Sequence, residues 1–148
     1  FHRTQIRKDC IFAALKRIKR IDMVNIRIEG TPKSPTVIFD EATGLLELKG
    51  RSIPEDSIDF YAPIIETITK YSKAPQNKTT VNIHLEYFNT SSSKCILDLF
   101  KQLENIARLE KDIVINWYFE EDDEDMREVG IDYETIIKVP FKMIEIEE

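Results

Sequence analysis

The sequence is poor in the residues that mark several common classes of protein. Cysteine occurs only at Cys10 and Cys95, too few for a disulfide framework and without metal-ligand spacing. There are four glycines and two histidines, with no Walker A loop, no paired-glycine fingerprint and no metal-binding histidine pair. The longest apolar run, Ile11 to Leu15, is far shorter than the roughly 20 residues that cross a bilayer. We therefore expect no integral membrane segment, no bound cofactor and no metal centre.

The composition itself fits a single globular domain. Of the 148 residues, 42% are hydrophobic and 32% are charged, which excludes collagen-like, low-complexity and wholly disordered chains. A chain of this length usually forms one domain with a substantial core. No secretory signal pattern is present, so the sequence predicts a cytoplasmic protein.

Positive and negative charges are separated along the chain. Residues 1–22 carry a net charge of +5 and residues 23–148 carry −11. Because an acidic body repels phosphate backbones, we expect no nucleic-acid partner for it. Apolar residues recur at helical spacing within the basic segment, which suits a membrane surface or an acidic partner. Met23 resembles an initiator, so we expect residues 1–22 to be a helical or disordered extension and 23–148 to be the domain.

Alternating apolar residues and turn signals predict the strands of this domain. The glycine of the turn 41–44 is expected in the left-handed conformation, which makes the flanking segments a β-hairpin. The expected strands are Val24–Ile28, Val37–Asp40, Leu45–Lys49, Val81–Tyr87, Ile113–Phe119 and Val139–Ile146.

Three helices are expected between and after these strands. The first opens at Ser52 and Glu55, a capping-box spacing, and buries a stripe of four residues, with Pro63 as a kink or an internal start. The second spans about 91–111 with a clear apolar stripe, and the third spans about 122–137 with a break near Gly130. The stripe of the first helix comprises Ile58, Tyr61, Ile65 and Ile68. The pattern predicts an α/β domain whose mixed sheet is covered by about three helices.

Four consecutive hydroxyl residues, Thr90 to Ser93, follow Asn89 where a strand gives way to the second helix. A helix start has unpaired N–H groups and the positive end of the dipole, so it favours a covalent or bound phosphate. The alternative is simple helix capping, because Asn, Thr and Ser are preferred N-caps.

Several segments of residues 23–148 together resemble the SiaC family of regulatory phosphoproteins, whose fold is similar to that of STAS domains, the anti-sigma-factor antagonists. The matching segments are Ile28 to Pro35, Gly50 to Glu55, Leu85 to Lys94 and Asn116 to Phe119. The resemblance does not extend to residues 1–22.

The resemblance implies a function. The threonine of the Asn-Thr-Ser motif, Thr90 here, is the residue that a protein kinase phosphorylates and a PPM-type phosphatase dephosphorylates. The unphosphorylated form binds and activates a diguanylate cyclase, which links the switch to cyclic di-GMP and biofilm behaviour in bacteria. Asn89, Thr90, Ser91 and Ser92 are the expected partner contacts. The alternatives are a constitutive interaction scaffold and an antagonist-like switch with a different partner.

Two further patterns suggest other chemistry. The acidic run Glu120 to Asp125 suits a divalent cation, but it lacks EF-hand spacing and equally suits the start of a helix. His84 could act as a base for Thr90 or Ser91 with Asp98 as its orienting acid, although a lone strand histidine more often packs or lies at the surface. We therefore expect no catalytic residues and a non-enzymatic protein.

Overall fold

The computed structural model describes residues 25–147, so the expected extension 1–22 lies outside the described residues. A six-stranded sheet runs in the order β1 to β6 along the chain. Its first three strands pair antiparallel, whereas β3 to β6 are parallel to one another. The strands are β1 (Ile26–Ile28), β2 (Thr36–Asp40), β3 (Leu45–Ser52), β4 (Lys78–Phe88), β5 (Asp112–Glu120) and β6 (Phe141–Ile146).

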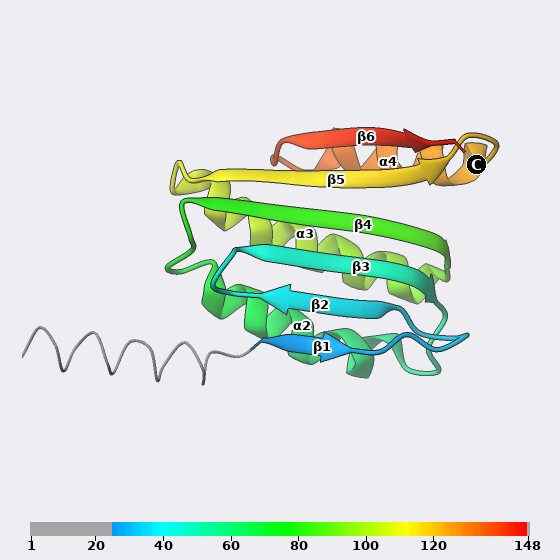
Figure 1. The fold of residues 1–148 in the computed structure, drawn as a ribbon, viewed down its shortest axis with the longest axis horizontal. Coiled ribbons are helices and arrows are strands. Elements are labelled where there is room, and N and C mark those ends of the chain that lie inside the picture. Colours follow the sequence, from blue (N-terminus) through cyan, green and yellow to red (C-terminus); the bar gives the residue numbers. More distant parts are fainter. Residues whose placement is uncertain (1–24, 148) are drawn as a thin grey trace, which may run out of the picture.

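The described residues form three helices, α2 (Ser57–Tyr71), α3 (Thr90–Arg108) and α4 (Glu124–Ile136). All three lie on one face of the sheet and leave the other face uncovered (Figure 1). The predicted α/β class, with a mixed sheet and about three helices, is confirmed. None of the helices in residues 25–147 is long and apolar enough to cross a membrane.

The core lies between the sheet and these helices. Alternate residues of the strands, such as Val81, Ile83 and Leu85 of β4, are buried against the helices. Trp117 of β5 is fully buried and donates its indole N–H to the carbonyl of Met126 at 3.0 Å. Cys95 is a small buried side chain of this core.

The predicted start of the first helix is wrong, and its predicted buried face is right only in part. Ser52 is the last residue of β3, and α2 begins at Ser57 with Asp56 as its N-cap, which accepts a hydrogen bond from the Asp59 amide at 3.0 Å. Ile58 is 72% exposed, because the helix turns a different stripe toward the core. The two stripes share Tyr61 and Ile68, so apolar spacing alone did not distinguish them. The buried residues of α2 are Ser57, Tyr61, Ile64, Ile68 and Tyr71.

Of two predictions made from glycines, one is confirmed and the other is wrong. Gly44 has a φ of +69°, as predicted for the turn of the β2–β3 hairpin. Gly130 does not break the third helix, and α4 is continuous through it. A Cβ at position 130 would lie 2.5 Å from Cδ1 of Trp117, so this glycine permits close packing of α4 against β5. Pro63 likewise lies inside an unbroken α2.

Candidate functional site at the start of helix α3

The predicted site lies at the carboxyl ends of the parallel strands, where β4 leads into α3 (Figure 1). Asn89 is the N-cap of α3, and its side-chain oxygen accepts a hydrogen bond from the Ser92 amide at 2.8 Å. The backbone amide of Asn89 donates to the carbonyl of Ser52 at 3.0 Å. The end of β3 therefore fixes the point at which α3 begins.

Buried hydroxyl groups connect this helix start to β3 and α2. The Oγ of Ser52 lies 2.7 Å from the hydroxyl of Tyr61 and donates to the Oγ of Ser92 at 2.8 Å. The Oγ of Ser57 lies 3.1 Å from that of Ser92. Burial raises the pKa of the Tyr61 hydroxyl well above its ordinary value, so this group stays protonated. We call these four residues, Ser52, Ser57, Tyr61 and Ser92, the buried hydroxyl cluster.

The cluster reaches the surface through Ser91. The Oγ of Ser57 lies 2.8 Å from the Oγ of Ser91, and Ser91 in turn donates to the side-chain oxygen of Asn89 at 3.2 Å. Ser91 is exposed as a residue, but its hydroxyl is engaged on two sides. The helix starts of α2 and α3 are thereby held side by side.

Thr90 differs from the three serines that follow it. It is exposed, and its side chain forms no hydrogen bond with any residue of the described range 25–147. Ser92 has no exposed surface and belongs to the buried hydroxyl cluster. Ser93 is half-buried, and its carbonyl accepts a hydrogen bond from Tyr133 of α4 at 2.8 Å. The expectation that Ser92 contacts a partner at the surface is therefore corrected, because its hydroxyl faces the core.

Sequence reasoning singled out Asn89, Thr90 and Ser91 as candidates but missed Ser52 and Ser57, which support the helix start. Ser52 was interpreted as a helix cap, and Ser57 carried no signal. Their partners on α3 are more than 30 residues away in the sequence, so no local pattern reports them.

The alternative catalytic arrangement is not assembled. His84 alternates along β4 with the buried Ile83 and Leu85, so it lies on the sheet face away from the helices, where its ring lies 5.9 Å from that of Tyr118. Partial burial lowers the pKa of His84, and the neighbouring Lys49 ammonium lowers it further. In the described part of the chain, no hydrogen bond joins His84 to Thr90, Ser91 or Asp98. This geometry does not activate a hydroxyl nucleophile.

The second half of the acidic run, Asp123 to Asp125, forms the start of α4. Asp123 is the N-cap and accepts a hydrogen bond from the Met126 amide at 3.0 Å, and Glu124 and Asp125 lie in the first turn. Carboxylates at these positions complement the helix dipole. Within residues 25–147, no group of three or more His, Cys, Asp or Glu side chains is arranged to hold a metal ion. Helix-start chemistry therefore accounts for Asp123, Glu124 and Asp125.

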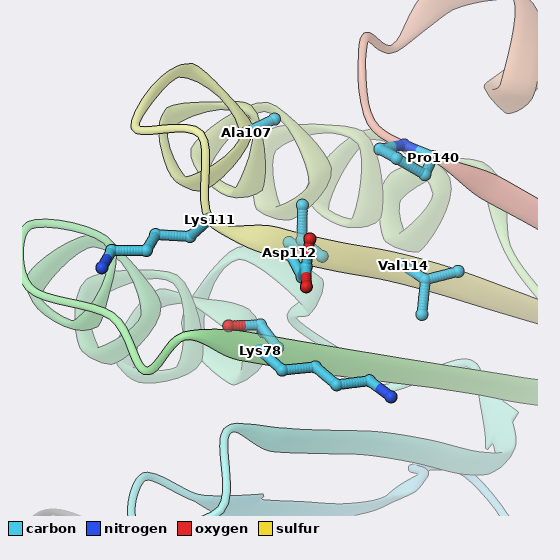
Figure 2. A pocket seen from close by; sticks show the side chains of 8 residues that line it. Lys78, Ala107, Lys111, Asp112, Val114 and Pro140 are labelled. Carbon is cyan, nitrogen blue, oxygen red and sulfur yellow. The ribbon is translucent and has the colours of Figure 1, made fainter.

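A pocket of about 410 Å³ lies at the opposite end of the sheet, and none of the predicted site residues lines it. Lys78, Lys111 and Asp112 are among the residues around it (Figure 2). Figure 2 shows the two lysine ammonium groups pointing away from each other. The Nζ of Lys111 donates to the side-chain oxygen of Asn77 at 3.0 Å. The pocket thus lacks converging groups that would hold a charged ligand.

Comparisons with known proteins relate the whole domain to one family. The family model described as SiaC family regulatory phosphoprotein matches residues 28–146. An uncharacterised protein of Pseudomonas aeruginosa strain UCBPP-PA14 is 25% identical over 119 residues, which cover 80% of this chain and 94% of that protein. The family match contains all the residues of the helix-start site.

Solved structures share the fold. SiaC of Pseudomonas aeruginosa superimposes with a TM-score of 0.77 at 23% identity, covering 84% of this chain and all of that one. A chain in the crystal structure of the diguanylate cyclase SiaD in complex with its activator SiaC, from the same species, gives a TM-score of 0.77 at 24% identity. That match covers 82% of this chain and 99% of the other. At these identities the structural likeness concerns the fold.

Proposed function

The chain belongs to the SiaC family of regulatory phosphoproteins, and from this premise we propose that it is a partner-switching regulator phosphorylated at Thr90. A protein kinase adds the phosphate and a PPM-type phosphatase removes it. The unphosphorylated form binds and activates an output partner, a diguanylate cyclase. The chain itself has no catalytic role in this scheme.

The observation that carries the proposal is the state of the four hydroxyls at the start of α3. A kinase needs an acceptor hydroxyl that is accessible and whose hydrogen bonds within the protein do not have to be broken first. Ser92 is buried, Ser93 is half-buried and Ser91 is hydrogen-bonded to two side chains. Thr90 is exposed and free of such bonds within residues 25–147, which makes it the best acceptor of the four.

A phosphate on Thr90 would change the surface that a partner meets. It adds about −1.5 to −2 charges and a hydration shell to a helix start whose first turn carries no acidic residue. Removing that water on docking costs several kcal/mol unless the partner supplies a cation, and ~1.4 kcal/mol is already tenfold in affinity. The dipole of α3 favours the charge within the free protein, so the fold survives while the partner is released.

The choice of a cyclase as partner is supported by the solved complex in which SiaC is the activator of the diguanylate cyclase SiaD. The relatedness of this chain to SiaC supports an equivalent role. We propose that Asn89, Thr90 and Ser91 form the centre of the contact, because they lie at the surface or border it.

The phosphoacceptor is tested without knowing the kinase. The purified chain is incubated with ATP and an extract of its source bacterium, and incorporated phosphate is located by peptide mass spectrometry. We expect phosphate on Thr90 and none in Thr90→Ala. Thr135→Ala is the matched control, because Thr135 is an exposed threonine of α4. Equal incorporation by Thr90→Ala, or phosphate found on a serine, would contradict the assignment of Thr90.

The output is tested with a purified diguanylate cyclase from the same bacterium. Cyclic di-GMP production is expected to rise with the unphosphorylated chain and to return to its basal rate with the phosphorylated chain. Activation by both forms would favour the constitutive scaffold instead.

A further inference from the structure

Lys94 is an exposed cation on α3, one helical turn after Thr90. Residues four apart on a helix are neighbours, with about 5–6 Å between their Cβ atoms. The Lys94 side chain forms no ion pair or hydrogen bond with any residue of the described range 25–147. Its ammonium group is therefore available to an anion carried at position 90.

The cations of α3 form one stripe along the helix. Lys94, Lys101 and Arg108 are seven residues apart, and Thr90 precedes the first of them by four. Arg108 is already within 3.8 Å of a carboxylate oxygen of Glu104. Lys101 lies about 16 Å beyond Thr90 along the helix axis. Lys94 is thus the cation of this helix that can reach position 90.

Asp98 competes for Lys94, because it lies four residues further along the helix. The direction of a pair matters: an anion placed four residues before a lysine stabilises a helix better than one placed four residues after it. A phosphate on Thr90 has the favourable direction, and Asp98 has the unfavourable one. The phosphate also carries more charge than a carboxylate.

Charged groups of other elements also lie near the start of α3. Burial raises the pKa of the Cys95 thiol, and the carboxylates of Asp98 and of Asp56, the N-cap of α2, raise it further, so acidic groups approach the first turns of α3 from two elements. Arg51 is a cation at the end of β3, where its Cα is paired with that of Tyr87 in the sheet. A phosphate in this acidic surrounding needs a nearby positive group.

We propose that Lys94 is the intramolecular counter-ion of the phosphate on Thr90, an inference that rests on the proposed function. Phosphorylation then changes two side chains at once. It adds charge at position 90 and draws the Lys94 ammonium from open solvent into an ion pair. A partner would meet both changes on the same stripe of α3.

The test installs phosphothreonine at position 90 during translation, by stop-codon suppression, so that no kinase is needed. The second pKa of the phosphate, ordinarily near 6, is measured by ³¹P NMR titration at low salt. We expect Lys94→Gln to raise this pKa by about 0.3 of a unit relative to the unsubstituted phosphoprotein. Lys94→Arg is expected to keep the lower value, and Asp98→Asn to lower it further.

Lys101→Gln is the matched control, since it removes an exposed lysine from the same stripe at a distance from Thr90. It is expected to leave the phosphate pKa unchanged. Equal pKa values in the unsubstituted and Lys94→Gln proteins, or an equal shift in Lys101→Gln, would overturn the proposal. The result does not depend on whether cells phosphorylate Thr90. Failure of the proposed function would instead appear as absent phosphate in the extract experiment.

Discussion

The starts of α3 and α4 are built alike and charged differently. Each begins where a parallel strand ends, and each N-cap side chain accepts a backbone amide three residues on, Asn89 at 2.8 Å and Asp123 at 3.0 Å. The first turn of α4 carries Glu124 and Asp125, whereas that of α3 carries no acid. A permanent carboxylate stabilises its helix at all times. In the function that we propose, a hydroxyl in the same place allows a negative charge to be added and removed as phosphate.

The prediction with the largest expected effect adds negative charge to the start of α3. Phosphorylation of Thr90 is expected to lower affinity for the output partner at least tenfold, because the dianion must be desolvated at the contact. Titration calorimetry of both forms against the same cyclase measures the ratio. Thr90→Asp is expected to give a smaller loss, since it adds one charge with planar geometry. Equal or tighter binding of the phosphorylated chain would contradict the proposal that phosphorylation releases the partner.

The second prediction separates the buried from the exposed hydroxyls of α3. Ser92→Ala removes a partner from both Ser52 and Ser57 in a site without solvent, so we expect a loss of about 2 kcal/mol in unfolding free energy. Ser91→Ala is the matched control at the surface end of the same chain of bonds, with an expected loss below about 0.5 kcal/mol. Urea unfolding measures both. Similar losses for the two variants would show that burial does not increase the contribution of the Ser92 hydroxyl to stability.

The starts of α3 and α2 were not equally predictable from the sequence. The spacing of the apolar residues and the preference of asparagine for N-caps were enough to place α3, because both signals are local. The N-cap of α2 was predicted four residues too early, at Ser52 and not at Asp56. Ser52 and Glu55 imitate a capping box, whereas Ser52 belongs to β3 and to the buried hydroxyl cluster. Gly130 was predicted to break the third helix, whereas the structure shows that a glycine is needed there for α4 to pack against Trp117.

The proposal of Thr90 as the phosphoacceptor among four hydroxyls also needed more than local sequence patterns. Every residue of the run has a hydroxyl at a helix start, so composition treats them alike. What distinguishes them is contact with β3 and α2, which come from distant parts of the chain. The family resemblance pointed to Thr90, and the hydrogen bonds supply a physical reason for that choice.

The third prediction concerns Tyr133, which joins the two regions by donating from α4 to the carbonyl of Ser93 on α3. Burial raises the pKa of Tyr133 to about 12. The folded form therefore holds this proton above pH 10 while the unfolded chain releases it, so stability falls as pH rises from 10 toward 12. Tyr133→Phe is expected to cost about 1 kcal/mol at pH 7 and to weaken this decline. Parallel curves for the two proteins between pH 9 and 11 would contradict it.

The smallest expected effect makes the start of α3 resemble that of α4. Asn89→Asp keeps a side-chain oxygen for the Ser92 amide and for the hydroxyls of Ser57 and Ser91, and it adds a permanent negative charge at the helix end. We expect a gain of about 0.3–1 kcal/mol in unfolding free energy at low salt, from the interaction with the dipole. Asp123→Asn is the reverse exchange at α4 and should lose a similar amount. Both differences should shrink in 1 M salt, where screening acts over about 3 Å.

The added charge lies beside Thr90, so Asn89→Asp should also weaken partner binding without any phosphate. Urea unfolding at two salt concentrations and calorimetry with the cyclase give the two readings. A variant that is more stable yet binds the partner unchanged would show that charge at this helix start does not control release.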